Sequence, residues 1–141
     1  MTRIITLLNE KNHYLEKFYS LNEVELTNFV QGRFDNLEYF YQTREKILDV
    51  LKYVDAQIEK THAEMEQNIE ICQEHKMSMK QAMRIKDEYV TRIIEQDIQV
   101  LACIEMAKNS IIKDLQEVRH NRKAMSGYKA KTFQNRLDEE V

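Results

Sequence analysis

The fold of this chain is decided by residues 37–72, LEYFYQTREKILDVLKYVDAQIEKTHAEMEQNIEIC. One set of positions in this stretch recurs with alternating spacings of four and three residues: Leu37, Tyr41, Arg44, Leu48, Leu51, Asp55, Ile58, His62, Met65, Ile69 and Cys72. The mean spacing is about 3.5 residues, the repeat of helices that pack against one another along their length. The stretch therefore predicts one long helix, over about residues 36–73, with a seam that faces other helices.

The chain on either side of this stretch has few residues that make turns. It contains no proline, and Gly32 and Gly127 are its two glycines in 141 residues. Because sheets and barrels need many turns, and turns use these residue types heavily, the composition favours long helices joined by few connections. Gly32 suits the end of one helix, and Asp35, with Glu38 three residues later, suits the start of the next.

Two further helices are expected, over about residues 2–31 and 79–126. Ser78 with Gln81 forms a second capping pattern, and Gly127 is expected to end the third helix. We therefore predict an all-α fold, an antiparallel bundle of three long helices over residues 1–126. A flexible C-terminal tail, residues 127–141, would follow it, first basic and then acidic.

Folding the chain at Gly32 and near Lys76 sets an expected register for the bundle. Two levels of polar residues result, one with Lys11, Asp55 and Asp97 and the other with Glu23, Arg44 and Lys108. Polar residues on an apolar seam commonly specify register and the number of partner helices. We expect a structural role for all six.

Charge and apolar content exclude several classes of protein. The net charge is −3, from 21 basic and 24 acidic residues, which is too balanced for a dedicated nucleic-acid protein. The basic residues from Arg119 to Arg136 leave binding of nucleic acid by the tail as the least favoured alternative. No segment approaches the roughly 20 apolar residues of a membrane span. We expect a soluble, cytoplasmic protein that does not insert into membranes.

Candidate catalytic and metal-binding residues are scattered. Three Glu-x-x-His pairs, Glu10/His13, Glu59/His62 and Glu117/His120, could suggest a two-metal site. The expected register places His120 roughly 43 Å of helix rise beyond the level of His62, so the pairs cannot share a metal. Cys72 and His75 form half of a zinc pattern without its second half. We expect no enzyme activity, no metal and no cofactor.

The third expected helix has more apolar residues than one neighbouring helix could cover. Eight of the ten residues from Ile98 to Ala107 are apolar. A second seam, Tyr89, Ile93, Val100, Cys103 and Ala107, runs beside the first, which includes Met83, Ile94, Leu101, Ile104 and Ile111. Either the other two helices cover both seams, or one groove stays open for another helix. Methionines such as Met77, Met79 and Met83 would let such a groove adapt to its partner.

Two stretches resemble a known family. Gly32-Arg33-Phe34-Asp35-Asn36-Leu37-Glu38, followed by Tyr41-Gln42-Thr43-Arg44-Glu45-Lys46-Ile47-Leu48, looks like the junction of the first two helices in flagellar type III export chaperones of the FlgN/FliT kind. Residues Ile93-Ile94-Glu95-Gln96-Asp97, then Ile104, Lys108, Ile111 and Leu115 to Tyr128-Lys129, are similar to the long last helix of that family. The chain departs from the family because its third helix shows no break that would create a short fourth helix.

The resemblance implies a function and its residues. Such chaperones hold the C-terminal helix of a secreted flagellar subunit, a hook–filament junction or cap protein, and deliver it to the export apparatus. The implied cargo-helix groove is formed by Met83, Ile93, Val100, Cys103, Ile104, Ala107 and Ile111. The implied contact with the export apparatus, or a masking tail, is formed by Arg119, Arg122, Lys123, Tyr128 and Lys129. The alternative is a structural coiled-coil protein that buries its surplus seam in a homodimer and binds no cargo.

Overall fold

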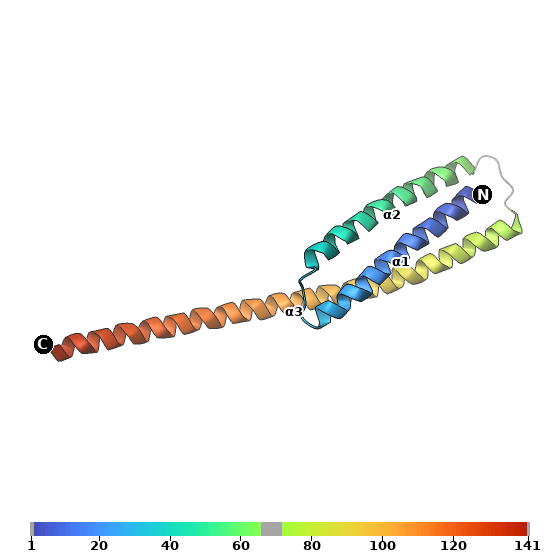
Figure 1. Cartoon of the computed structure of the whole chain (residues 1–141). Helices are drawn as coiled ribbons and strands as arrows, with labels where there is room; N and C mark the ends of the chain where they lie inside the picture. Colours follow the sequence, from blue (N-terminus) through green and yellow to red (C-terminus); the bar gives the residue numbers. More distant parts are fainter. Residues whose placement is uncertain (1, 66–71, 141) are drawn as a thin grey trace. The chain divides into compact units, whose positions relative to one another are not determined.

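The computed structural model describes the backbone of residues 2–65 and 72–140, and side chains up to residue 127 (Figure 1). The described residues form three helices, α1 (Thr2–Val30), α2 (Leu37–Met65) and α3 (Gln73–Glu140), and none of them forms a strand. The predicted all-α fold with three long helices is confirmed.

The chain divides into two compact units. The N-terminal unit, Met1–Cys103, contains α1, α2 and the first part of α3, and the C-terminal unit, Ile104–Val141, contains the rest of α3. The predicted end of the third helix at Gly127 is wrong, because α3 continues through this residue. Gly127 lies inside α3, where the interior of a long helix tolerates one glycine at a cost of about 1 kcal/mol.

The first connection follows the sequence pattern closely. Gly32 has a φ of +77°, its N–H donates to the carbonyl of Phe29 at 3.0 Å, and the Arg33 N–H donates to the carbonyl of Asn28 at 2.9 Å. These two bonds form the Schellman motif, in which a glycine with positive φ ends a helix. Helix α2 then begins at Leu37, and the Asn36 carbonyl accepts its first helical bond, from the Phe40 N–H at 2.8 Å. The cap is Asn36 rather than the predicted Asp35.

The second reversal of the chain comes earlier than the sequence pattern predicted. Helix α2 ends at Met65 and α3 begins at Gln73, so Ser78, the expected cap, lies inside α3. Cys72 precedes α3, and its carbonyl accepts the Lys76 N–H at 3.1 Å. The predicted continuation of the second helix through Ile69 falls on residues 66–71, outside the described part of the chain.

The earlier reversal changes the register of α3. The predicted level of Lys11 and Asp55 is confirmed, because their side chains form an ion pair of 2.6 Å between α1 and α2. Asp97 was expected at the same level but pairs with Arg44, eleven positions before Asp55 in α2, at 2.8 Å. Moving the centre of an antiparallel reversal by about five residues shifts every facing pair by about twice that number. The expected level of Asp97 was wrong for this reason.

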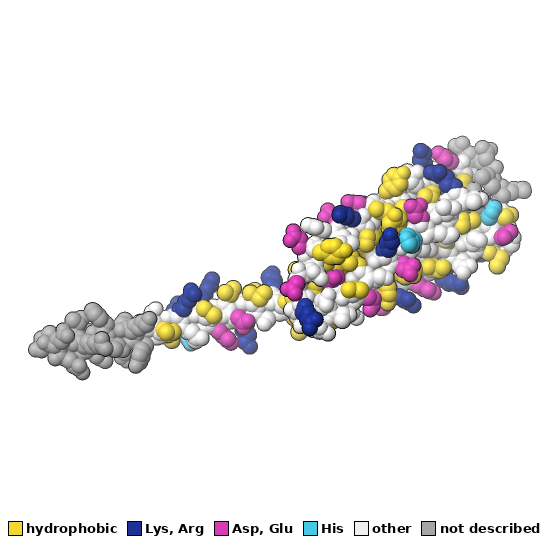
Figure 2. Space-filling view, in the orientation of Figure 1, with side chains coloured by type: hydrophobic (Ala, Val, Ile, Leu, Met, Phe, Trp, Pro, Cys, Tyr) yellow, Lys and Arg dark blue, Asp and Glu magenta, His cyan; other side chains and the backbone are white. Residues whose placement is uncertain are grey.

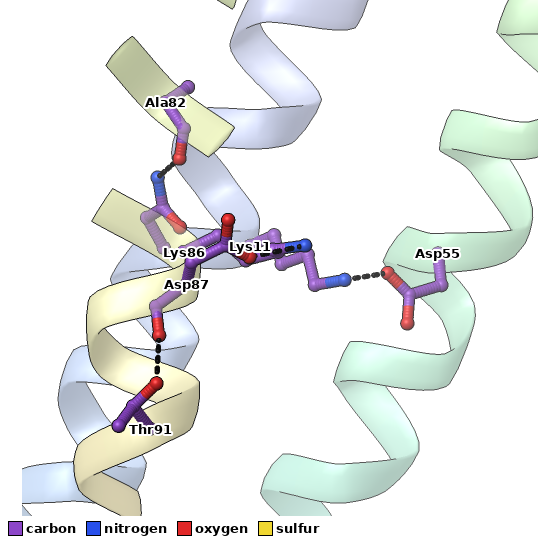
Figure 3. Close-up of polar contacts among 7 residues, drawn as sticks. Lys11, Asp55, Ala82, Lys86, Asp87 and Thr91 are labelled. Carbon is purple, nitrogen blue, oxygen red and sulfur yellow. Dashed lines mark hydrogen bonds and ion pairs between the residues drawn. The ribbon is translucent and has the colours of Figure 1, made fainter. Parts of the chain in front are cut away.

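Consecutive residues of α1 anchor it to both neighbours, as Figure 3 shows for Lys11. Lys11 extends toward Asp55 of α2, whereas Asn12, which is buried, donates its Nδ2–H to the carbonyl of Ala82 in α3 at 2.9 Å. Successive Cβ atoms on a helix point about 100° apart, so Lys11 and Asn12 face different neighbouring helices. The three helices therefore meet at this level of the N-terminal unit.

The core of the N-terminal unit draws on all three helices. Leu15 and Phe18 of α1 pack with Leu51 of α2 and Ile93 of α3. Near the first connection, Phe40 is completely buried and contacts Phe29 edge-on, with ring centroids 5.4 Å apart. Burial of such side chains contributes roughly 1.5–3 kcal/mol each, so these contacts stabilise the N-terminal unit.

Candidate partner-binding surface

Two residues predicted to line an open groove lie in the core instead. Ile93 is 8% exposed and packs between α1 and α2, and Val100 is 2% exposed. The prediction of an open groove at these two residues is therefore wrong. The reason is the second seam of α3, to which both belong: this seam faces the bundle, and the first two helices cover it.

Part of the first seam of α3 is left open, although Val90 of the same seam packs against the core. Within the N-terminal unit, Ile94 is 54% exposed and Leu101 is 64% exposed, and Ile98, beside them, is 62% exposed. The other two helices thus cover the second seam of α3 and leave these residues of the first seam exposed. An exposed apolar surface of this kind is typical of a contact with another protein.

Met83, also predicted to contact cargo, is 42% exposed. It lies with Met79 over a shallow hollow of about 480 Å³, lined further by Lys76, Lys80, Arg84 and Asp87. The described residues that line this hollow all belong to α3, and they are separated by one helical turn or more from the exposed Ile94.

The C-terminal unit carries the longest exposed run of the first seam. We call these residues the C-terminal seam: Ile104, Lys108, Ile111, Leu115, Val118, Arg122 and Met125. Ile104 is half-buried, whereas Ile111, Leu115, Val118 and Met125 are between 47% and 61% exposed. Figure 2 shows hydrophobic side chains reaching the surface along the described part of this unit. Every described side chain from Lys108 to Gly127 is exposed.

Of the other predicted cargo residues, Cys103 and Ala107 are half-buried and Ile111 is on the C-terminal seam. Leu115, Val118 and Met125 belong to the same surface but were not among the predicted contacts. The signal that could have found them is the unbroken alternation of four and three residues through Met125.

The C-terminal seam is basic as well as apolar. Lys108 and Arg122 are its two charged members, both exposed, and no carboxylate lies on the seam. Neither side chain has an ion pair or hydrogen bond with any residue whose side chain is described. They are fourteen residues apart, which is about 21 Å of helix rise. A helix that covers the seam would enclose both cations.

The predicted export-apparatus residues fall into two groups. Arg119, Arg122 and Lys123 are exposed on the C-terminal unit. Arg119 and Lys123 share a helix face with Ile112, beside the seam, because residues three to four positions apart are neighbours on a helix. The side chains of Tyr128 and Lys129 lie outside the described residues.

The remaining candidates are the possible metal ligands, the two cysteines and a membrane-spanning helix. Among the described residues, no group of three or more His, Cys, Asp or Glu side chains could hold a metal ion. Cys72 is exposed and Cys103 is half-buried, and both are free thiols. Within the same part of the chain, no helix has the length and apolar character that crossing a membrane requires.

The side chain of Asp97 has polar contacts with both other helices of the N-terminal unit. Arg44 Nη2–H donates to Asp97 Oδ2 at 2.8 Å, and Asn22 Nδ2 lies 3.5 Å from Asp97 Oδ1. The Arg44 guanidinium also lies 5.2 Å from the centroid of the Phe18 ring. This group is enclosed by the helices that it joins, so it orients the bundle and is not a surface for a partner.

Comparison of the chain with protein-family models, with curated proteins and with solved structures finds no match. The function must therefore be argued from the surfaces of this chain.

Proposed function

We propose that this protein is an export chaperone for a flagellar axial protein, of the hook–filament junction or cap kind. In this proposal it binds the C-terminal amphipathic helix of its cargo in the cytoplasm. Binding prevents premature assembly, and the complex is delivered to the export apparatus. The proposal rests on the resemblance of residues 32–48 and 93–129 to such chaperones, together with one structural observation.

That observation is the exposure of Ile111, Leu115, Val118 and Met125 on one side of the C-terminal unit. A helix that exposes such a stripe gains free energy when a partner removes the stripe from water, at roughly 25 cal/mol per Å² of apolar area. Several hundred Å² would suffice to drive binding before the loss of translational and rotational freedom is subtracted. The core of the N-terminal unit meanwhile gives the chain a stable body, so the open stripe can serve binding.

The proposal is tested by the solution mass of the protein, alone and after co-expression with C-terminal helical fragments of flagellar axial proteins. We expect a one-to-one complex with one fragment. The double variant Ile111→Asp, Leu115→Asp should lose this complex, because both side chains are exposed and their replacement leaves the core intact. The control is Gln116→Asp, which adds a carboxylate at an exposed position of the same helix that is not on the C-terminal seam. Failure of every fragment to bind would contradict the proposal.

Contact with the export apparatus is assigned to Arg119, Arg122, Lys123, Tyr128 and Lys129. The exposed Arg119 and Lys123 can be changed without touching the C-terminal seam. Their replacement by glutamate should leave cargo binding intact and reduce cargo export in cells. Unchanged export would contradict a contact between these residues and the export apparatus.

A second candidate is a homodimeric structural coiled-coil protein. The observation that favours it is the seven-residue recurrence of Ile104, Ile111, Val118 and Met125. It predicts a tight dimer whose mass does not change in the presence of any flagellar fragment.

A further inference from the structure

The C-terminal seam combines apolar and positive side chains in a regular order. Written as a heptad, its first core position is occupied by Lys108, Leu115 and Arg122, and its second by Ile104, Ile111, Val118 and Met125. The two cations therefore lie where a covering helix would make its closest contacts, and not at the edge of the surface.

A helix that covers this seam removes both positive charges from water. Enclosing an ammonium or a guanidinium group without a counter-charge is strongly unfavourable, whereas a facing carboxylate offsets that cost. Lys108 and Arg122 have no carboxylate partner among the described side chains. The counter-charges must therefore come from the occupant, at two positions about 21 Å apart.

The C-terminal seam of a second copy does not supply them. In a parallel pair, identical core positions face each other, so Lys108 would meet Lys108 and Arg122 would meet Arg122. In an antiparallel pair, the facing seam would still present cations and no carboxylate. Leucine at the first core position with isoleucine or valine at the second also favours assemblies larger than a dimer.

We propose that the C-terminal seam binds an acidic amphipathic helix, whose apolar stripe carries two carboxylates fourteen residues apart, facing Lys108 and Arg122. This inference rests on the proposed function, since the helix would be that of the cargo, and it adds the charge pattern by which the cargo is selected. Matching charges across an interface mainly discriminates between partners and sets the register in which they bind.

The test uses three synthetic helical peptides of four heptads with the same leucine stripe. The first has glutamate at two stripe positions fourteen residues apart, the second has lysine at both, and the third has its two glutamates seven residues apart. Binding to the full-length protein is measured by fluorescence anisotropy. We expect the first peptide to bind about tenfold or more tightly than each of the others.

Charge-reversed variants make the test specific. Lys108→Glu with Arg122→Glu should reverse the preference, so that the lysine peptide binds better than the first glutamate peptide. The matched control is Lys52→Glu with Lys113→Glu, which changes the net charge equally at exposed positions off the seam. It should leave the preference for the first peptide in place, because these positions do not face the bound helix.

Several outcomes would overturn the inference. They are equal binding of the three peptides, a preference that the seam variant does not alter, and a tight homodimer that the first peptide cannot dissociate. Equally strong binding of a single-stranded oligonucleotide would show a general anion site instead. Binding of flagellar fragments without any charge preference would remove this inference and leave the proposed function standing. Binding of the first peptide but of no flagellar fragment would contradict the proposed function and leave the charge preference of the C-terminal seam standing.

Discussion

Asp97 of α3 and Arg44 of α2 form an ion pair of 2.8 Å, and both side chains are about a quarter exposed. The same carboxylate lies 3.5 Å from the amide of Asn22 in α1, which is completely buried. One residue of α3 thus carries polar contacts to both other helices of the N-terminal unit. Because a slip of one turn would separate all three groups, this contact selects one register.

Replacing Asp97 should therefore cost more than replacing a carboxylate that pairs at the surface. We expect Asp97→Asn to lower the free energy of unfolding by about 1–2 kcal/mol, because Arg44 is left half-buried without its counter-charge. The matched control is Asp55→Asn, which breaks the Lys11 pair of a half-exposed carboxylate and should cost less than about 1 kcal/mol. Urea unfolding at neutral pH measures both, and equal losses would contradict the special place of Asp97.

Two consecutive residues of α3 should respond in opposite ways to the same substitution. Val100 is 2% exposed and Leu101 is 64% exposed. Val100→Asp places an uncompensated charge in the core and should lower the free energy of unfolding by about 3 kcal/mol or more. Leu101→Asp should change it by about 0.5 kcal/mol or less. Thermal unfolding followed by circular dichroism distinguishes them, and a stable Val100→Asp protein would contradict the described packing of α3.

The two glycines should also respond in opposite ways to alanine. Gly32 has a φ of +77°, a conformation that costs a residue with a side chain about 1–2 kcal/mol, so Gly32→Ala should destabilise the protein. Gly127 lies inside α3 with open space where a Cβ atom would be, so Gly127→Ala should strengthen the helix by about 0.5–1 kcal/mol. The helical circular dichroism signal during heating measures both effects. A lower signal for Gly127→Ala would indicate that the helix ends at this glycine.

The phenol of Tyr19 should ionise at a higher pH than an ordinary tyrosine. Its pKa is raised first by the hydrogen bond to the Glu23 carboxylate, then by the negative charge of Glu23, while Arg92 lowers it. Because the folded-state pKa exceeds the unfolded value of about 10, this contact stabilises the protein below pH 10 and is lost as the pH rises further. Glu23→Gln should bring the pKa back toward 10, as measured by NMR of labelled tyrosine. An unchanged pKa would contradict the Glu23 contact.

Local chemistry made several features of the fold predictable from the sequence. The alternation of four and three residues predicted α2, and Gly32 marked the end of α1 because its backbone conformation suits few other residues. The Lys11–Asp55 pair also followed, since the first connection is short and its position clear. Gly127 misled the prediction, because a glycine is compatible with both the end and the interior of a helix.

The second connection contains neither glycine nor proline, so its position could not be predicted from the sequence. The register of α3 depends on that position and could not be predicted either. Only the tertiary structure paired Asp97 with Arg44. The candidate partner-binding surface was likewise predictable only in part. The sequence by itself determined that α3 has two apolar seams, because helical spacing is a local property. Which seam faces the bundle depends on packing between segments far apart in the chain, and that packing buried Val100 and left Leu101 and Ile111 exposed.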